Sequence, residues 1–129
     1  RQLDPAFTRR PDGHRRFAHF LVECLDNDIF VALVAVEDDE VLGYALAKEE
    51  RYPPVFERSR HGSLFDMAVH PDRQRQGIGS ALLAAVEQWT RDRGIDRLEL
   101  RVSVHNPRGR AFWARHGFED YLAVAAKEL

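Results

Sequence analysis

The sequence predicts an α/β fold, a sheet with helices on its faces, and this prediction depends on three observations. Apolar residues recur at helical spacing in two segments, 14–25 and 78–89. Short segments rich in β-branched and aliphatic residues precede and follow the second of these helices. From the third predicted strand onward, strands and helices alternate along the chain, which is typical of a sheet covered by helices.

The bulk composition limits the class of protein. The 129 residues fit one domain, residues 1–129, with 44% hydrophobic residues and a net charge of −2. Such a chain lacks the basic excess of a nucleic-acid-binding surface. Its longest apolar run, IFVALVAV, has only eight residues, too few to span a membrane. The single cysteine, Cys24, suits a reducing, cytoplasmic compartment. Because the chain starts at Arg1 and its one methionine is Met67, we expect that some N-terminal chain is missing.

The first half of the chain is predicted to form a helix, a hairpin and a loop. The helix covers 14–25. The nearly continuous apolar run 29–36 predicts a buried strand, the acidic stretch 37–40 a turn, and 41–47 the returning strand. Two prolines and a glycine predict a loop over 51–62.

The next predicted strand, 63–69, is apolar except at Asp66. The helix that follows ends at Gly94, because glycine readily adopts the left-handed conformation of a helix terminus. One face of this helix is apolar: Ile78, Leu82, Ala85, Val86 and Trp89.

The last part of the chain is predicted to form a strand, a helix and a strand. The segment 97–105 alternates between apolar and polar residues, as a half-buried strand does. Asn106 is a candidate N-cap, Pro107 fits the first helical position, and Gly117 ends the helix. The tail 118–129 is predicted to be one more strand.

The turn HPDRQRQGIGS, residues 70–80, has the properties of an anion site. A helix N-terminus exposes N–H groups and carries a partial positive charge, and Gly77 and Gly79 have no side chain to block a phosphate. Side chains nearby can add donors or charge: Arg73, Arg75 and Ser80. The turn has no P-loop lysine, and Leu82 stands where a dinucleotide fingerprint needs its third glycine.

Two motifs resemble the signatures of the GNAT superfamily of acyl-CoA-dependent N-acyltransferases. The residues Q-R-Q-G-I-G at 74–79 are similar to its pyrophosphate loop, Q/R-x-x-G-x-G/A. Residues 106–118 are similar to its second signature, N-x-x-A-x-x-x-Y-x-x-x-G-F. The resemblance covers about residues 29–129. It implies a mixed, mostly antiparallel sheet flanked by helices and splayed between the family's fourth and fifth strands, here 63–69 and 97–105.

The resemblance also implies roles for individual residues. The backbone around Met67, Ala68 and Val69 would pair with the pantetheine arm of acetyl-CoA, and Asn106 would reach the same arm. The backbone of the loop would hold the pyrophosphate, through Gln74, Arg75, Gln76, Gly77, Ile78, Gly79 and Ser80.

Two residues depart from the family pattern. Trp113 replaces the tyrosine that often protonates the leaving thiolate. An indole N–H is not an acid near neutral pH, so Trp113 would supply only a flat apolar wall to the cofactor. Since a thiol with a pKa of about 8.5 is already a fair leaving group, this weakens catalysis without excluding it. Gly109 replaces the alanine of the second signature.

The function implied is transfer of an acetyl or other acyl group from acetyl-CoA to a primary amine by direct attack in a ternary complex. Asp66, the charged residue of an apolar strand beside the thioester, is the candidate base or amine anchor; an ion pair with Arg101 is an equal alternative. The residues Tyr44 and Tyr121 are weaker candidates for the acceptor pocket.

Two other functions remain open: a non-catalytic acyl-CoA-binding module, which Trp113 favours, and a plain phosphate-binding domain. The acceptor can be a small-molecule or a peptide amine. No metal is expected, because six histidines and one cysteine show no ligand spacing. The net charge of −2 and the shortness of the longest apolar run argue against a nucleic-acid and a membrane partner. The oligomeric state is open, with a homodimer through edge strands as the candidate.

Overall fold

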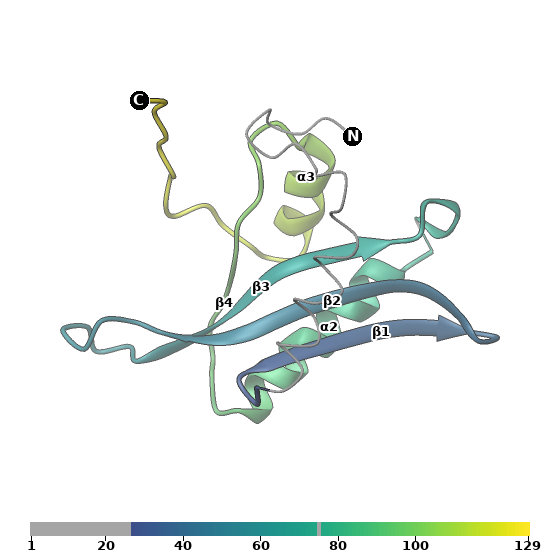
Figure 1. The fold of residues 1–129 in the computed structure, drawn as a ribbon, viewed down its shortest axis with the longest axis horizontal. Coiled ribbons are helices and arrows are strands. Elements are labelled where there is room, and N and C mark those ends of the chain that lie inside the picture. The colour runs from purple at the N-terminus through teal and green to yellow at the C-terminus, as the bar shows by residue number, and fades with distance from the viewer. Residues whose placement is uncertain (1–26, 75) are drawn as a thin grey trace. The chain divides into compact units, whose positions relative to one another are not determined.

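The computed structural model describes residues 27–74 and 76–129, which fall into two compact units, 27–101 and 102–129. The larger unit holds a sheet of four strands in the order β1-β2-β3-β4 (Figure 1). The first three strands pair antiparallel, and the fourth runs parallel to β3. This mixed sheet and its flanking helix confirm the predicted α/β class. The strands are β1 (Phe30–Glu37), β2 (Glu40–Arg51), β3 (Arg60–Val69) and β4 (Leu98–Leu100).

The hairpin of β1 and β2 closes where the acidic stretch predicts a turn. Glu37 pairs with Glu40, and the two residues between them have φ angles of 50° at Asp38 and 64° at Asp39. Positive φ at both central positions is the geometry that matches the twist of a two-residue hairpin, and aspartate tolerates it.

The loop between β2 and β3 is shorter than predicted. Tyr52 N–H donates to the carbonyl oxygen of Ser59 at 3.0 Å, so the hairpin continues beyond the end of β2. Phe56 N–H donates to the Pro53 carbonyl at 3.1 Å and forms the turn itself. The two prolines of the sequence therefore lie at the tip of a long hairpin, which projects from the sheet (Figure 1).

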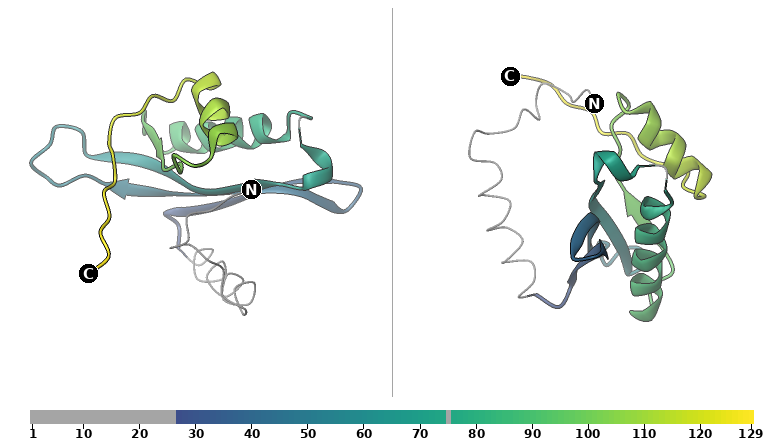
Figure 2. Two further views of the ribbon diagram at one scale, coloured as in Figure 1. Left: turned by 90° about the horizontal axis from the view of Figure 1, so that it is seen from above. Right: turned by 90° about the vertical axis from the view of Figure 1, so that its right-hand side faces the viewer.

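Helix α2 (Ile78–Asp92) lies along one face of the sheet (Figure 2). Its buried residues are Leu82, Leu83, Val86 and Thr90. The predicted apolar face is thus wrong in one detail, because Ala85 is exposed and Leu83 is buried. Small residues on β2 explain the close packing: a Cβ at Gly43 would lie 3.3 Å from the Leu82 side chain. The helix ends as predicted, with Gly94 at a φ of 76°.

Two of the predicted strands in this unit need correction. The first predicted strand is not buried, because β1 lies at the edge of the described sheet and exposes Val34 and Val36. The strand predicted over 97–105 shortens to β4, since it pairs with β3 only from Gly62 to Leu64. The predicted helix over 14–25 lies outside the described residues.

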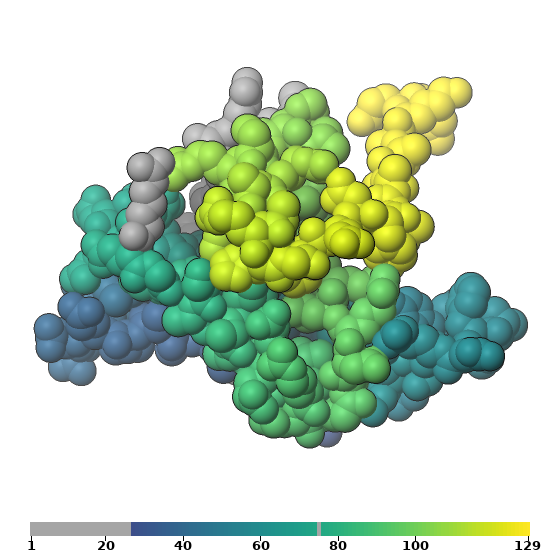
Figure 3. All heavy atoms as spheres, turned by 180° about the vertical axis from the view of Figure 1, so that it is seen from behind, coloured from purple at the N-terminus to yellow at the C-terminus, as the bar shows by residue number. Residues whose placement is uncertain are grey.

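The smaller unit, 102–129, contains α3 (Pro107–Arg115). Asn106 caps this helix and Gly117, at a φ of 89°, follows its end, as predicted. The tail 118–129 forms no strand, contrary to the prediction, and Figure 3 shows it as a narrow extended arm. A strand needs a hydrogen-bonding neighbour, and in the described part of the chain the tail has none; its Leu122 and Val124 are exposed.

Candidate active site

The pairing between β3 and β4 stops in the middle of β3. The last pair is Leu64 with Leu100, whereas β3 remains paired with β2 as far as Val69. From Phe65 onward, no strand of the unit 27–101 covers the edge of β3 that faces away from β2. This open edge is what the predicted splay between these two strands requires.

A β-bulge at Phe65 coincides with the end of that pairing. Leu46 pairs with Asp66 and Ala47 with Leu64, so Phe65 is an extra residue opposite β2. A bulge shifts the alternation of the strand by one residue. Before the bulge, Gly62 N–H donates towards β4, to the Arg97 carbonyl at 2.8 Å.

After the bulge, the outward-facing amides belong to Met67 and Val69. His70 N–H donates to the Leu42 carbonyl of β2 at 2.6 Å. Because successive residues alternate, the N–H and C=O groups of Val69, and of Met67 two residues earlier, point away from β2 to the open edge. These are two of the three residues expected to pair with pantetheine, and without the bulge the outward amides would belong to Asp66 and Ala68.

Asp66 faces the side of the sheet opposite α2. Its neighbour across the strand is Leu46, whereas Gly43 and Ala45 face the helix. The carboxylate is half-buried, and its Oδ2 accepts a hydrogen bond from the Tyr44 hydroxyl at 3.0 Å. Arg101 is exposed, and the structure shows no ion pair between it and Asp66 in the described chain.

The turn before α2 has the backbone geometry of an anion site. Gly77 has a φ of 80°, and no side chain caps the helix. A Cβ at Gly77 would meet nothing within 4 Å, so the space in front of the turn is open. The first helical hydrogen bond is donated by Ala81, which leaves the amides of Ile78 and Gly79 without an intrahelical acceptor.

The side chains around this turn differ from expectation at one position. Arg73, in the short helix η2 (Pro71–Arg73), lies 3.4 Å from Glu37 and 4.0 Å from Glu40, so its charge is directed to the β1–β2 turn. Gln74 and Gln76 are exposed. Arg75 lies outside the described residues.

In the unit 102–129, Asn106 and Gly109 fit together. Asn106 Oδ1 accepts the Gly109 N–H at 3.1 Å, and a Cβ at Gly109 would lie 2.5 Å from Asn106 Nδ2. An alanine at this position would require the capping side chain of Asn106 to shift. Trp113 is half-buried and packs edge-to-face on Phe112 at 4.8 Å and on Phe118 at 5.6 Å. The cofactor contacts expected of Asn106 and Trp113 stay predictions.

A cluster of polar residues that the sequence did not predict lies at the end of the sheet next to the β2–β3 loop, the hairpin end. The Tyr52 hydroxyl donates to Glu99, and Arg97 Nε donates to Glu99 at 3.0 Å. Burial, and then the hydrogen bond to Glu99, raise the pKa of Tyr52 to about 12. His61 is buried, stacks on Tyr52 at 4.4 Å, and lies 3.2 Å from Glu50 and 3.4 Å from Glu99. The signal was weak, because His61 falls in a segment with the composition of a loop.

Glu49 is a buried carboxylate on the helix-facing side of the sheet. It accepts from Arg60 Nη1 at 3.1 Å and from Arg93 Nε at 3.0 Å. Burial opposes its charge, but the hydrogen bond from Arg93 and the charges of both arginines outweigh burial and hold the pKa of Glu49 below its usual value. Two guanidinium groups offset this charge, so Glu49 ties the end of α2 to the sheet.

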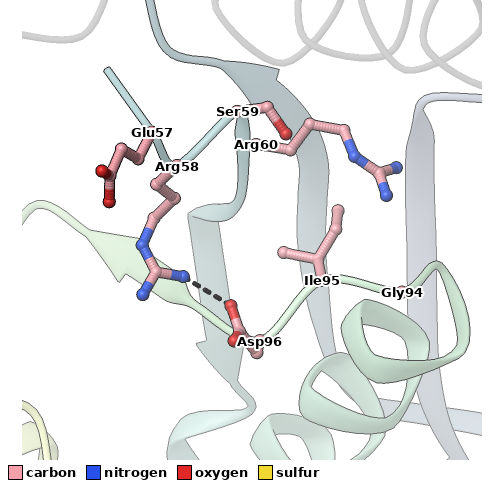
Figure 4. A pocket seen from close by; sticks show the side chains of 7 residues that line it. All are labelled: Glu57, Arg58, Ser59, Arg60, Gly94, Ile95 and Asp96. Atoms are coloured by element: carbon pink, nitrogen blue, oxygen red, sulfur yellow. Dashed lines mark hydrogen bonds and ion pairs between the residues drawn. The ribbon is translucent and has the colours of Figure 1, made fainter.

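A shallow pocket lies at the same end of the sheet, far along β3 from the open edge (Figure 4). Its lining comes from the end of the β2–β3 loop, the first residue of β3 and the loop after α2: Glu57, Arg58, Ser59, Arg60, Gly94, Ile95 and Asp96. Its arginines are already paired, Arg58 with Asp96 and Arg60 with Glu49. The guanidinium charges of this pocket are therefore already compensated.

The chain belongs to the acetyltransferase (GNAT) family, whose model matches residues 1–118. It is 32% identical over 111 residues to the aminoglycoside N(6')-acetyltransferase type 1 of Stenotrophomonas maltophilia, covering 85% of this chain and 72% of that protein. A mycothiol acetyltransferase of Rhodococcus jostii is 30% identical over 93 residues, which cover 72% of this chain and 30% of that protein.

Solved structures confirm the likeness in fold. The aminoglycoside N-acetyltransferase AAC(6')-Iy in complex with CoA superposes with a TM-score of 0.78 at 23% identity, covering 100% of this chain and 97% of that one. A predicted acetyltransferase with acetyl-CoA from Clostridium acetobutylicum gives a TM-score of 0.76 at 21% identity, covering 93% and 79% of the two chains.

Two features are absent from the described residues. No group of three or more histidine, cysteine or acidic side chains is arranged there to hold a metal ion. No helix among these residues is long and apolar enough to cross a membrane.

Proposed function

We propose that the protein transfers an acetyl or similar acyl group from acetyl-CoA to a primary amine, by direct attack within a ternary complex. The observation that carries this proposal is the open edge of β3, where the amides of Met67 and Val69 face outward. A pantetheine arm can add to such an edge as an extra strand. The uncapped start of α2 suits the pyrophosphate.

The proposed cofactor contacts are those marked by the family signatures. Family membership supports them, and the outward amides and the open space at Gly77 add support from the geometry. The proposed residues are Met67, Ala68, Val69, Gln74, Arg75, Gln76, Gly77, Ile78, Gly79, Ser80, Asn106 and Trp113.

In the proposed reaction, the acceptor nitrogen bonds to the thioester carbonyl carbon, and the carbon–sulfur bond breaks. An alkyl amine with a pKa of about 10.4 arrives as an ammonium ion and must lose a proton before it attacks. Asp66 is the proposed acceptor of that proton, which then passes to solvent. A second proton leaves the nitrogen as the amide forms and ends on the CoA sulfur, directly or through water.

The outward N–H groups of β3 also suit the negative charge that develops on the carbonyl oxygen. A fixed amide donor stabilises such an oxyanion without having to reorganise, and Val69 N–H is the proposed donor. Trp113 does not protonate the leaving sulfur, because its N–H does not ionise near neutral pH. Holding the two reactants together supplies most of the rate in this scheme.

We propose a small-molecule amine as the acceptor, with a peptide amine as the alternative. Support comes from the relative in Stenotrophomonas maltophilia, which is named for acetylation of aminoglycosides. A second function, a non-catalytic acyl-CoA-binding module, is favoured only by Trp113 in place of the family's tyrosine.

The test has two stages. Acetyl-CoA is first titrated while the melting temperature is recorded, with ATP as the control, and only acetyl-CoA is expected to raise the melting temperature. Release of free thiol from acetyl-CoA is then measured with sisomicin, spermidine and Nα-acetyl-lysine amide. Thiol release supports the enzyme, whereas binding without release on any of these amines supports the module. Equal shifts with ATP and acetyl-CoA would contradict both functions.

A further inference from the structure

A tyrosine hydroxyl holds one of the two oxygens of Asp66. Tyr44 pairs with Ala68 across the β2–β3 ladder, so it is a diagonal neighbour of Asp66 on the same face. Such neighbours are about 7–8 Å apart at the backbone, a gap that an aromatic side chain can bridge. The Tyr44 hydroxyl does so and donates to Asp66 Oδ2 at 3.0 Å. Within the described chain, the structure shows no other polar contact to this carboxylate, which leaves Oδ1 for a ligand.

The charge of Asp66 is handled differently from the charges of Glu49 and Glu99, two other carboxylates that the sheet buries wholly or in part. Glu49 is buried between two arginines, and Glu99 is paired with Arg97 at 3.0 Å. A guanidinium ion offsets each of those charges, whereas the tyrosine hydroxyl at Asp66 is a neutral donor. Since buried or half-buried charges are normally paired, the half-buried Asp66 carboxylate is suited to receive a cation from outside the chain.

Among the described residues, one ammonium group lies on the same face nearby, and it already has partners. Lys48 Nζ lies 3.1 Å from Glu50 Oε1. It also lies 5.6 Å from the centre of the Phe65 ring and 5.9 Å from that of Phe30. These contacts direct Lys48 along the strand to Glu50, away from Asp66.

We propose that Tyr44 is a positioning residue for the acyl transfer. By holding Oδ2 it presents Oδ1 of Asp66 to the incoming nitrogen, and because it is neutral it leaves the whole carboxylate charge to attract that nitrogen as an ammonium ion. The inference rests on the proposed function and narrows its acceptor to amines that arrive as cations. The bulge at Phe65 makes the Tyr44–Asp66 hydrogen bond possible, because it turns Asp66 to the face on which Tyr44 lies.

The test compares two variants that each remove one tyrosine hydroxyl hydrogen-bonded to a carboxylate. Tyr44→Phe keeps the ring and removes the donor to Asp66, and Tyr52→Phe does the same to Glu99 at the hairpin end. With spermidine as acceptor, Tyr44→Phe is expected to lower kcat about tenfold, the effect of one lost hydrogen bond. Tyr52→Phe is expected to leave kcat unchanged, and both variants should keep the wild-type melting shift with acetyl-CoA.

A double-mutant cycle distinguishes positioning from packing. If Tyr44 acts through Asp66, adding Tyr44→Phe to Asp66→Asn should cause no further loss of kcat, since the two effects then share one carboxylate. Additive losses would overturn the positioning role. Equal kcat/KM values for spermidine and for aniline, which is uncharged at neutral pH, would overturn the selection of cations.

The remaining outcomes separate this inference from the function on which it rests. If the wild-type protein releases no thiol with any amine, the proposed function fails and the role of Tyr44 fails with it. If the wild type turns over and Tyr44→Phe matches it, or if Tyr52→Phe loses as much as Tyr44→Phe, only the role of Tyr44 fails.

Discussion

Each end of the sheet contains a tyrosine hydroxyl that donates to a carboxylate, but the charged neighbours of the two carboxylates differ. At the hairpin end, Tyr52 donates to Glu99, and Arg97 offsets the carboxylate charge. At the open edge of β3, Tyr44 donates to Asp66, and no cation of the described chain pairs with it. The first carboxylate is paired with a guanidinium group, whereas the second lies beside an edge of β3 that no strand of the described chain covers. The difference teaches that the partners of a buried carboxylate, more than its burial, indicate whether it is available for a ligand.

The largest effect is expected from removing the charge at the open edge. Asp66→Asn should lower kcat about 10²–10⁴-fold, the usual contribution of a general base. It should leave the affinity for acetyl-CoA within about twofold, because Asp66 is not among the proposed cofactor contacts. Steady-state kinetics with spermidine and titration of acetyl-CoA measure the two effects. A wild-type rate would remove Asp66 from the mechanism.

At the hairpin end, replacing a carboxylate by its amide should lower the stability of the fold and leave catalysis intact. Glu49→Gln is expected to lower the free energy of unfolding at pH 7 by about 1–3 kcal/mol, because it leaves two guanidinium groups without their carboxylate. The pKa of Glu49 is lowered in the fold, so its stabilisation is present above the ordinary value of 4.5 and is lost as the pH falls through the folded pKa.

Urea unfolding of the wild type and of Glu49→Gln at pH 7 and pH 3 measures this dependence. The difference between the two proteins should shrink at pH 3. A lower kcat for the folded Glu49→Gln protein than for the wild type at pH 7 would contradict the contrast between the two ends.

The two ends of α2 offer a matched pair of glycines. Gly77, at a φ of 80°, precedes the helix, and Gly94, at a φ of 76°, follows it. Substitution by alanine should cost about 1–2 kcal/mol at either site, because a Cβ is strained in the left-handed region. Only Gly77→Ala is expected also to weaken acetyl-CoA binding, about tenfold, since its methyl group enters the space proposed for the pyrophosphate. Equal acetyl-CoA affinities in the two variants would place the cofactor elsewhere.

The smallest effect is expected at alkaline pH. The pKa of Tyr52 is raised to about 12, so its contribution to stability is complete below the ordinary value of 10.0 and is lost as the pH rises towards 12. The wild type should therefore lose stability relative to Tyr52→Phe between pH 10 and pH 12. Melting temperatures of both proteins over this range measure the effect, and parallel curves would show that Tyr52 ionises as it does in the unfolded chain.

Signals carried by single residues predicted much of the fold. Gly77 and Gly94 mark the limits of α2, and Asn106 with Gly117 marks those of α3, as expected. These predictions succeed because left-handed φ angles and side-chain caps depend on a few neighbouring atoms. The predicted tail strand failed because extended structure needs a partner strand, and the composition of a segment does not supply one.

By itself, the sequence determined that a glycine turn opens a helix after an apolar strand interrupted by Asp66. It also showed that this turn resembles the first family signature and that residues 106–118 resemble the second. Only the tertiary structure decided which way that strand faces. Strict alternation would put Asp66 on the helix side with Leu64, but the bulge at Phe65 moves it to the side of Tyr44 and turns the amides of Met67 and Val69 outward. A bulge arises from the register between two strands, so no single strand carries its signal.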